Sequence, residues 1–174
     1  AASAGCPLLR LTGHLCAHPL YRLVTATALP QVTRAARAFE TTSWAALQKQ
    51  LVDSLETAPT GPCRAVAASA FLWGSGSAEA PLEGLRRLPA WRWALEGPQV
   101  HSDPHQAGGL ERSLGLLSNS RAPAPALAAA AAKATTMLQA SAYVHQYERN
   151  GVGREELAEA LLALVQVQHD YQRL

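Results

Sequence analysis

Hydrophobic and polar positions alternate with two different periods in the first third of the chain. Residues 20–29, LYRLVTATAL, combine β-branched residues with apolar alternation and are followed by Pro30, so they predict a strand. Ser43 stands directly before an apolar stripe of helical spacing, which predicts a helix with this serine as its N-cap. The stripe consists of Trp44, Leu47, Leu51 and Leu55.

Shorter elements are expected between this helix and residue 120. The small-residue apolar run 63–73 is bounded by a proline and a glycine, which favours a buried strand. Residues 82–88 favour a short helix. Prolines and glycines interrupt residues 91–110, so only short strands fit there, and residues 111–120 predict one further strand that ends in turn-forming residues.

The last third of the chain has the composition of helices. Residues 124–149 are rich in strong helix formers and predict one long helix that stops at Asn150-Gly151. Residues 154–171 predict a second helix with two glutamates at its positive end. The order of elements therefore indicates an α/β (α+β) fold, in which strands and helices are mixed and a C-terminal helical hairpin closes the chain.

Composition narrows the class of protein. A length of 174 residues and a hydrophobic content of 48% suit one domain, or one domain with a docked subdomain, that buries a core. The formal net charge of +2 is too small to favour nucleic-acid binding. No apolar run reaches the ~20 residues of a membrane span, and three cysteines without framework spacing favour reduced thiols in a cytosolic compartment.

Charge is unevenly distributed along the chain. The first 39 residues contain no acid and four arginines, whereas the last 32 residues contain five acids and three bases. This polarity suits a subunit that makes directional contacts with other proteins, although unselected surface charge accounts for it nearly as well.

The stretch HLCAHP contains a potential metal-binding triplet. In an extended strand, His14, Cys16 and His18 would share one face and could supply three ligands of a zinc site. The fourth ligand would have to be Cys6 or Cys63, and no CxxC or HxxxH accompanies the triplet. Packed histidine and cysteine side chains are therefore the favoured interpretation, and a zinc-dependent module is the alternative.

Other candidate catalytic groups are isolated. His101 and His105 flank Asp103 in HSDPH, where an exposed loop is favoured over a metal site. His145 lies between two tyrosines of a predicted helix and is better explained as a packed or interface residue than as a general base. The chain contains no GxSxG motif.

Two segments resemble the tubulin family. The first is HLCAHPLYRLVTATALP, in which a proline pair frames a strand, followed by a basic loop and the helix at Trp44. The second is LLSNS at 116–120, followed by a long helix containing SAYVHQYERNGVGREEL and a final helix that ends HDYQRL. HLC-x-HP and YVHQY are most similar to the delta type of that family. The resemblance extends over nearly the whole chain and is loosest at 75–110.

The resemblance implies a particular fold and domain organisation. Residues 1–121 would form the intermediate (second) tubulin domain, incomplete at its N-terminus, built as a two-layer mixed sheet with helices. Residues 122–174 would form the C-terminal helical hairpin. HLCAHP would then be the turn between a helix and the first strand of that domain, rather than a metal site.

The resemblance also implies what chemistry to expect. Tubulins bind GTP through a glycine-rich loop in their first domain, and the nearest string here, GSGS at 74–77, lacks the required spacing. In the helix before HLCAHP, where tubulins carry a catalytic acid, this sequence has Arg10, which stays protonated and cannot serve as a base. We therefore expect no enzyme activity and no cofactor in this chain, with GTP binding by the complete protein.

Contact residues are expected in two places. In tubulins, the segment corresponding to 30–42 makes lateral contacts and inserts an aromatic residue into the next subunit. By position this aromatic anchor would be Phe39, with Arg34 and Arg37 as its charged flanks. A Phe39 that covers its own helix, with solvated arginines, is an equally weighted alternative. The final helix would lie on the outer face of a filament, with Glu155, Glu156 and Glu159 available to partner proteins or simply to solvent.

The expected function is structural. The resemblance implies a tubulin-family subunit that acts by protein–protein contacts in the assembly and maintenance of triplet microtubules of centrioles and basal bodies. Expected partners are epsilon tubulin, alpha or beta tubulin and centriolar proteins, in the cytoplasm and cytoskeleton, without nucleic acid or membrane. The alternative is a stand-alone, nucleotide-free adaptor that is derived from a tubulin domain and binds tubulin or a centriolar scaffold.

Overall fold

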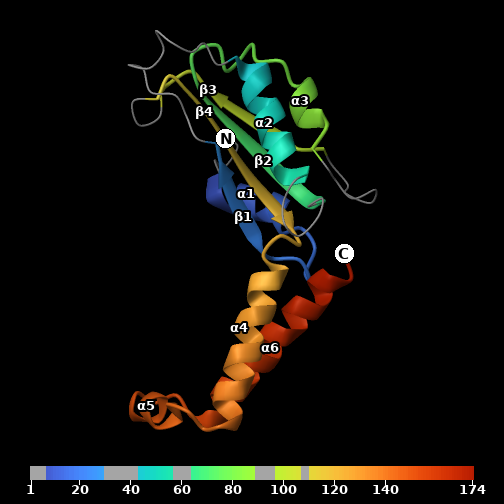
Figure 1. Ribbon diagram of the computed structural model, residues 1–174. Coiled ribbons are helices and arrows are strands. Elements are labelled where there is room, and N and C mark those ends of the chain that lie inside the picture. Colours follow the sequence, from blue (N-terminus) through green and yellow to red (C-terminus); the bar gives the residue numbers. More distant parts are fainter. Residues whose placement is uncertain (1–6, 30–42, 57–63, 89–96, 107–109) are drawn as a thin grey trace, which may run out of the picture. The chain divides into compact units, whose positions relative to one another are not determined.

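The computed structural model describes residues 7–29, 43–56, 64–88, 97–106 and 110–174 (Figure 1). It divides into two compact units, Ala1–Ser120 and Arg121–Leu174. Each unit is described by itself below. The assignment of these units to the two tubulin segments named above stays a prediction.

The first unit is built on a four-stranded mixed sheet with the order β1-β4-β2-β3. The strands are β1 (Val24–Ala28), β2 (Ala65–Gly74), β3 (Gln99–Asp103) and β4 (Arg112–Ser120). β4 lies antiparallel to both β1 and β2, whereas β3 lies parallel to β2. The mixed α/β class and the strands expected at 63–73, within 91–110 and at 111–120 are confirmed.

Helices α2 (Trp44–Glu56) and α3 (Glu83–Arg86) pack over one face of this sheet (Figure 1). The amide of Ala46 donates to the Ser43 hydroxyl oxygen at 3.2 Å, so the expected N-cap is present. The predicted stripe of α2 faces inward, and Leu55 lies at its margin. The core beneath the helices contains Trp44, Leu47, Leu51, Leu72, Leu85, Leu114 and Leu116.

The first strand is shorter than the sequence pattern predicted. Helix α1 (Pro7–Leu15) is followed by a turn, and β1 begins only at Val24. Two turn contacts keep the preceding residues out of the sheet ladder: the Tyr21 amide donates to the His18 carbonyl at 3.2 Å, and Arg22 Nε donates to the Pro19 carbonyl at 2.7 Å. The alternating pattern of LYRLVTATAL is therefore longer than the part of it that pairs with β4.

The second unit is helical, but its first predicted helix is divided. α4 (Ala124–Gln139) stops ten residues before the expected end, and α5 (Val144–Arg149) follows as a separate helix. The Ala142 amide donates to the Met137 carbonyl at 2.8 Å and the Ser141 amide to the Leu138 carbonyl at 3.0 Å. Together with Ser141 at φ 51°, these two bonds form a Schellman motif without glycine. No glycine or proline marks this break between α4 and α5 in the sequence.

Helix α6 (Arg154–Gln172) packs against α4, which confirms the expected C-terminal helical hairpin (Figure 1). The turn before α6 contains Gly151 at φ 84°, a conformation that favours glycine. The Gly153 amide donates to Glu156 Oε2 at 2.8 Å, so the glutamate side chain satisfies a backbone donor ahead of the helix.

One buried side chain joins the beginning of the first unit to its last strand. Asn119 on β4 is completely buried. Its Nδ2 donates to the Leu15 carbonyl at 2.7 Å and to the Tyr21 carbonyl at 2.8 Å. The first bond holds the C-terminal end of α1, and the second holds the turn that leads into β1, so both ends of that connection are fixed to β4.

We predict that Asn119→Asp lowers the free energy of unfolding by about 3 kcal/mol, because a buried carboxylate would replace a donor facing two carbonyl oxygens. Urea unfolding followed by circular dichroism measures this change. The matched control is Asn150→Asp, since Asn150 makes a similar bond to the Gln146 carbonyl at an exposed position. Equal stability of the two variants would contradict the assigned role of Asn119.

Candidate functional site

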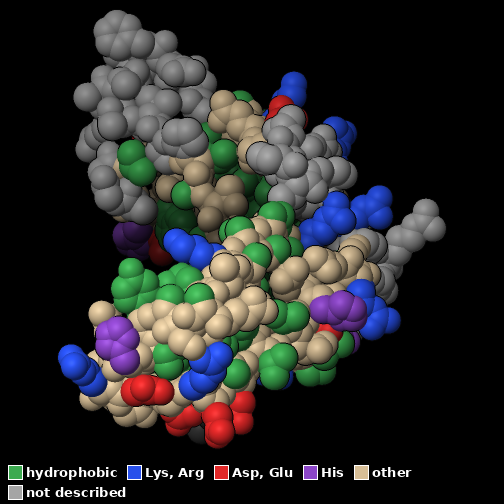
Figure 2. All heavy atoms as spheres, turned by 60° about the horizontal axis from the view of Figure 1, so that its bottom comes forward, with side chains coloured by type: hydrophobic (Ala, Val, Ile, Leu, Met, Phe, Trp, Pro, Cys, Tyr) green, Lys and Arg blue, Asp and Glu red, His purple; other side chains and the backbone are tan. Residues whose placement is uncertain are grey.

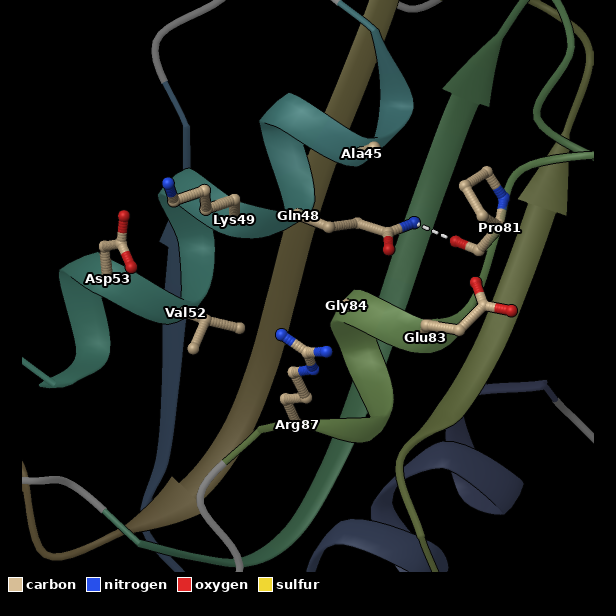
Figure 3. A pocket seen from close by; sticks show the side chains of 9 residues that line it. All are labelled: Ala45, Gln48, Lys49, Val52, Asp53, Pro81, Glu83, Gly84 and Arg87. Atoms are coloured by element: carbon tan, nitrogen blue, oxygen red, sulfur yellow. Dashed lines mark hydrogen bonds between the residues drawn. The ribbon is translucent and has the colours of Figure 1, made fainter.

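A cleft of about 430 Å³ lies between α2 and α3 on the helical face of the first unit (Figure 3). Its walls come from one face of α2 and from the segment that leads into and through α3. The lining residues are Ala45, Gln48, Lys49, Val52, Asp53, Pro81, Glu83, Gly84 and Arg87.

A close approach of the two helices forms this cleft. Gln48 is 1% exposed, and its Nε2 donates to the Pro81 carbonyl, which ties α2 to the chain that enters α3. A Cβ added at Gly84 would lie 2.6 Å from Gln48 Oε1 and 2.7 Å from Gln48 Cβ. The absence of a side chain at Gly84 therefore sets the distance between the helices.

The lining combines an apolar surface with balanced charge. Lys49 and Asp53 come from α2, Glu83 and Arg87 come from α3, and Val52 lies between them (Figure 3). None of the described residues that line it is a serine, cysteine or histidine, so this part of the lining offers no nucleophile paired with a histidine base.

We predict opposite effects on stability for two helical glycines. Gly84→Ala lowers the free energy of unfolding by about 1–3 kcal/mol, because the new Cβ overlaps Gln48 in a packed site. Gly13→Ala in α1, where nothing lies within 4 Å, raises it by up to about 1 kcal/mol, because alanine is the better helix former.

Thermal and urea unfolding of both variants measure these changes in the free energy of unfolding. A gain in stability at Gly84 similar to that at Gly13 would show that the two helices do not approach as closely as described.

The HLCAHP residues have separate contacts. His14 Nε2 lies 3.2 Å from the Ala68 carbonyl, and Cys16 Sγ lies 3.8 Å from the Arg22 carbonyl. The His18 ring packs against the Tyr21 ring at 4.8 Å between centroids. His14 and Leu15 end α1, and the rest of the segment forms the turn before β1, as the resemblance implied, so it is not the extended strand on which the zinc alternative was based. Within the described ranges, no three His, Cys, Asp or Glu side chains group as metal ligands; Cys6 and Cys63 lie outside those ranges.

The HSDPH segment forms the end of β3 and an exposed turn. His105 Nδ1 lies 2.7 Å from Asp103 Oδ1, and the His105 amide donates to the same oxygen at 2.9 Å. The backbone bond from His105, followed by its side-chain bond, lowers the pKa of Asp103 below its ordinary value of 3.8. His101 instead stacks on Phe71 at 4.9 Å between ring centroids.

We predict that His105→Ala raises the pKa of Asp103 only part of the way toward 3.8, since the backbone donor remains. His105→Pro removes both donors and should return the pKa of Asp103 to its ordinary value. Because the folded-state pKa is the lower one, the stability that this bond contributes is complete above pH 3.8 and is lost as the pH falls below it. Carboxyl titration by NMR checks this order of Asp103 pKa values. Identical Asp103 pKa values in the unmodified chain and in both variants would contradict it.

The GSGS segment is a turn after β2. Gly74 has φ 119° and Gly76 has φ 70°, and a Cβ at Gly74 would lie 2.0 Å from the Glu111 carbonyl oxygen. The Ser75 carbonyl accepts from Trp44 Nε1 at 3.1 Å and from Arg112 Nε at 3.3 Å. The glycines therefore serve a tight turn that is fixed to α2 and β4. Arg10 lies within α1, whose first turn contains no acid.

The predicted contact residues are divided between described and undescribed parts. Arg34, Arg37 and Phe39 lie in 30–42, outside the described residues. Glu155, Glu156 and Glu159 lie exposed in the first half of α6, and Glu155 and Glu159 are one turn apart on one side. Figure 2 shows acidic side chains gathered at one edge of the visible face. His145 is exposed on α5. The roles of these residues in contacts stay predictions.

Sequence reasoning did not identify the cleft between α2 and α3. Gln48 lies four residues after Trp44 and three before Leu51, so helical spacing places it on the inward face of α2, but its polar side chain does not mark it as buried. Gly84 gave a second signal, because a glycine inside a short helical pattern usually has a packing reason.

A mixed sheet covered by helices, with a helical hairpin after it, is the class of fold expected for the C-terminal part of a tubulin. The chain is similar to curated tubulin delta chains. It is 25% identical to that of Mus musculus and 24% identical to those of Homo sapiens and Macaca fascicularis, over 196 aligned positions. The match covers 95% of this chain and 43% of each relative, so the chain spans less than half the length of these proteins.

No family model matches the chain. Among the described residues, none of the helices is both long enough and apolar enough to cross a membrane.

Proposed function

We propose that this chain is part of a tubulin-family subunit and acts in the cytoskeleton by protein–protein contact. The observation that carries the proposal is the similarity to tubulin delta chains over 95% of the chain, on a fold of the expected mixed class. The exposed acids of α6 are compatible with this role.

The finer part of the proposal follows from the delta type of these relatives. The subunit contributes to the assembly or maintenance of triplet microtubules in centrioles and basal bodies, with epsilon tubulin as the first partner to examine and alpha or beta tubulin and centriolar proteins after it. The complete protein binds GTP in a domain outside this chain, and the chain itself contributes contacts only.

Binding to purified tubulins tests this proposal. Chain 1–174 is fluorescently labelled, and its affinity for epsilon tubulin and for the alpha–beta heterodimer is measured by anisotropy. We expect saturable binding to at least one of them, and Phe39→Ala should weaken it by roughly tenfold or more, as loss of an aromatic anchor does. The same affinity in GTP and GDP is expected, because the chain supplies no nucleotide contact of its own.

The matched control is Tyr147→Ala, which removes an aromatic ring that is 52% exposed on α5, outside the proposed contact loop. This variant should bind as the unmodified chain does. Absence of binding to every tubulin would contradict the proposed function. Equal loss in both variants would contradict the role of Phe39, and tight binding to a centriolar scaffold alone would favour the adaptor alternative.

A further inference from the structure

Strand β1 lies at one edge of the sheet, because β4 is its neighbour on one side and the strand order ends there (Figure 1). The Leu29 amide donates to the Leu114 carbonyl at 3.3 Å, in the same register as the β1–β4 pairing. Antiparallel ladders alternate, so Thr25 and Thr27 direct their backbone groups toward β4. The N–H and C=O groups of Val24, Ala26 and Ala28 therefore point away from the sheet.

Among the described residues, β1 carries no charged side chain, proline or bulge at this edge. In natural proteins, charged side chains, proline or a bulge often prevent an edge strand from pairing with another chain. The β1 sequence is VTATA, without charge or proline, and its pairing with β4 is continuous in register. Val24 at the start of the strand is 40% exposed. Among the residues that the structure describes, no strand pairs with this edge.

We infer that a second copy of this chain pairs with β1 in antiparallel orientation, which joins two four-stranded sheets into one. Hydrogen bonds form only where outward-facing residues meet outward-facing residues. A two-fold axis through Ala26 satisfies this requirement: Ala26 meets Ala26 of the second copy, and Val24 meets Ala28 of the second copy. Each such pair exchanges two N–H···O bonds.

The side chains favour this self-pairing over pairing with an unrelated strand. With Ala26 on the axis, Thr25 lies opposite Thr27 of the second copy at a non-hydrogen-bonded position, where side chains approach most closely. Threonine pairs of this kind stabilise antiparallel strands. On the other face, the half-exposed Val24 covers Ala28 of the second copy. The three central residues, Thr25, Ala26 and Thr27, therefore read the same in both directions.

The symmetry of this pairing limits the assembly to a dimer. An interface in which the same strand contacts itself about a two-fold axis is isologous and closes after two copies. β1 is then an internal strand of an eight-stranded sheet made from two chains of four strands each.

Sedimentation velocity over a concentration series tests the inference. We expect a monomer–dimer equilibrium of the unmodified chain. Ala26→Lys should raise the dimer dissociation constant by roughly tenfold or more, because it places two like charges directly opposite each other on the axis. The control is Ala163→Lys, at an exposed position of α6, which should leave the dissociation constant unchanged.

Amide hydrogen exchange measured by NMR at low and high protein concentration identifies the surface. The amides of Val24, Ala26 and Ala28 should become protected as the concentration rises, whereas those of Thr25 and Thr27 should be protected at both concentrations. The same experiment on Ala26→Lys verifies that this variant is folded. A monomer at all concentrations would overturn the inference, as would a dimer in which the three outward amides exchange as fast as in the monomer.

Discussion

The two hydrogen bonds donated by the Asn119 side chain are the constraint on which the first unit depends. They bind the end of α1 and the turn before β1 to the last strand of the sheet, across about a hundred residues of sequence. An asparagine suits this position because its NH₂ group supplies two donors, one to each of two backbone carbonyl oxygens. The two segments that carry the tubulin resemblance, HLCAHP with its strand and LLSNS, therefore meet at one side chain, and the resemblance corresponds to a physical contact.

Much of this fold could be predicted from sequence because its elements differ in hydrophobic period. The stripe at Trp44, the run of small apolar residues before Gly74 and the helix formers after Pro123 each specified one element. The positions at which the elements begin and end were harder to predict. The turn bonds of Tyr21 and Arg22 shorten β1, and Ser141 at φ 51° ends α4 where glycine would be the usual signal. Both depend on backbone geometry that the side-chain pattern does not record.

The site was harder to predict than the fold. The cleft between α2 and α3 exists because Gln48 and Gly84 pack against each other, and neither residue has a chemical type that marks a site. The residues that did attract attention have ordinary roles where they are described: His14 contacts a backbone carbonyl, His105 faces an exposed aspartate, and the GSGS glycines form a turn. The described surfaces comprise a cleft with balanced charge, a helix with exposed acids and a strand edge without charged residues.

The most direct test of this account is the exchange rate of the Asn119 side-chain amide protons, measured by NMR on an otherwise unmodified chain. If this amide holds α1 and β1 to β4, both protons exchange slowly and show NOE contacts to residues next to Leu15 and Tyr21. A side-chain amide that exchanges as fast as that of the exposed Asn150, without such contacts, would mean that the two resembling segments do not meet there. The central claim would then be wrong.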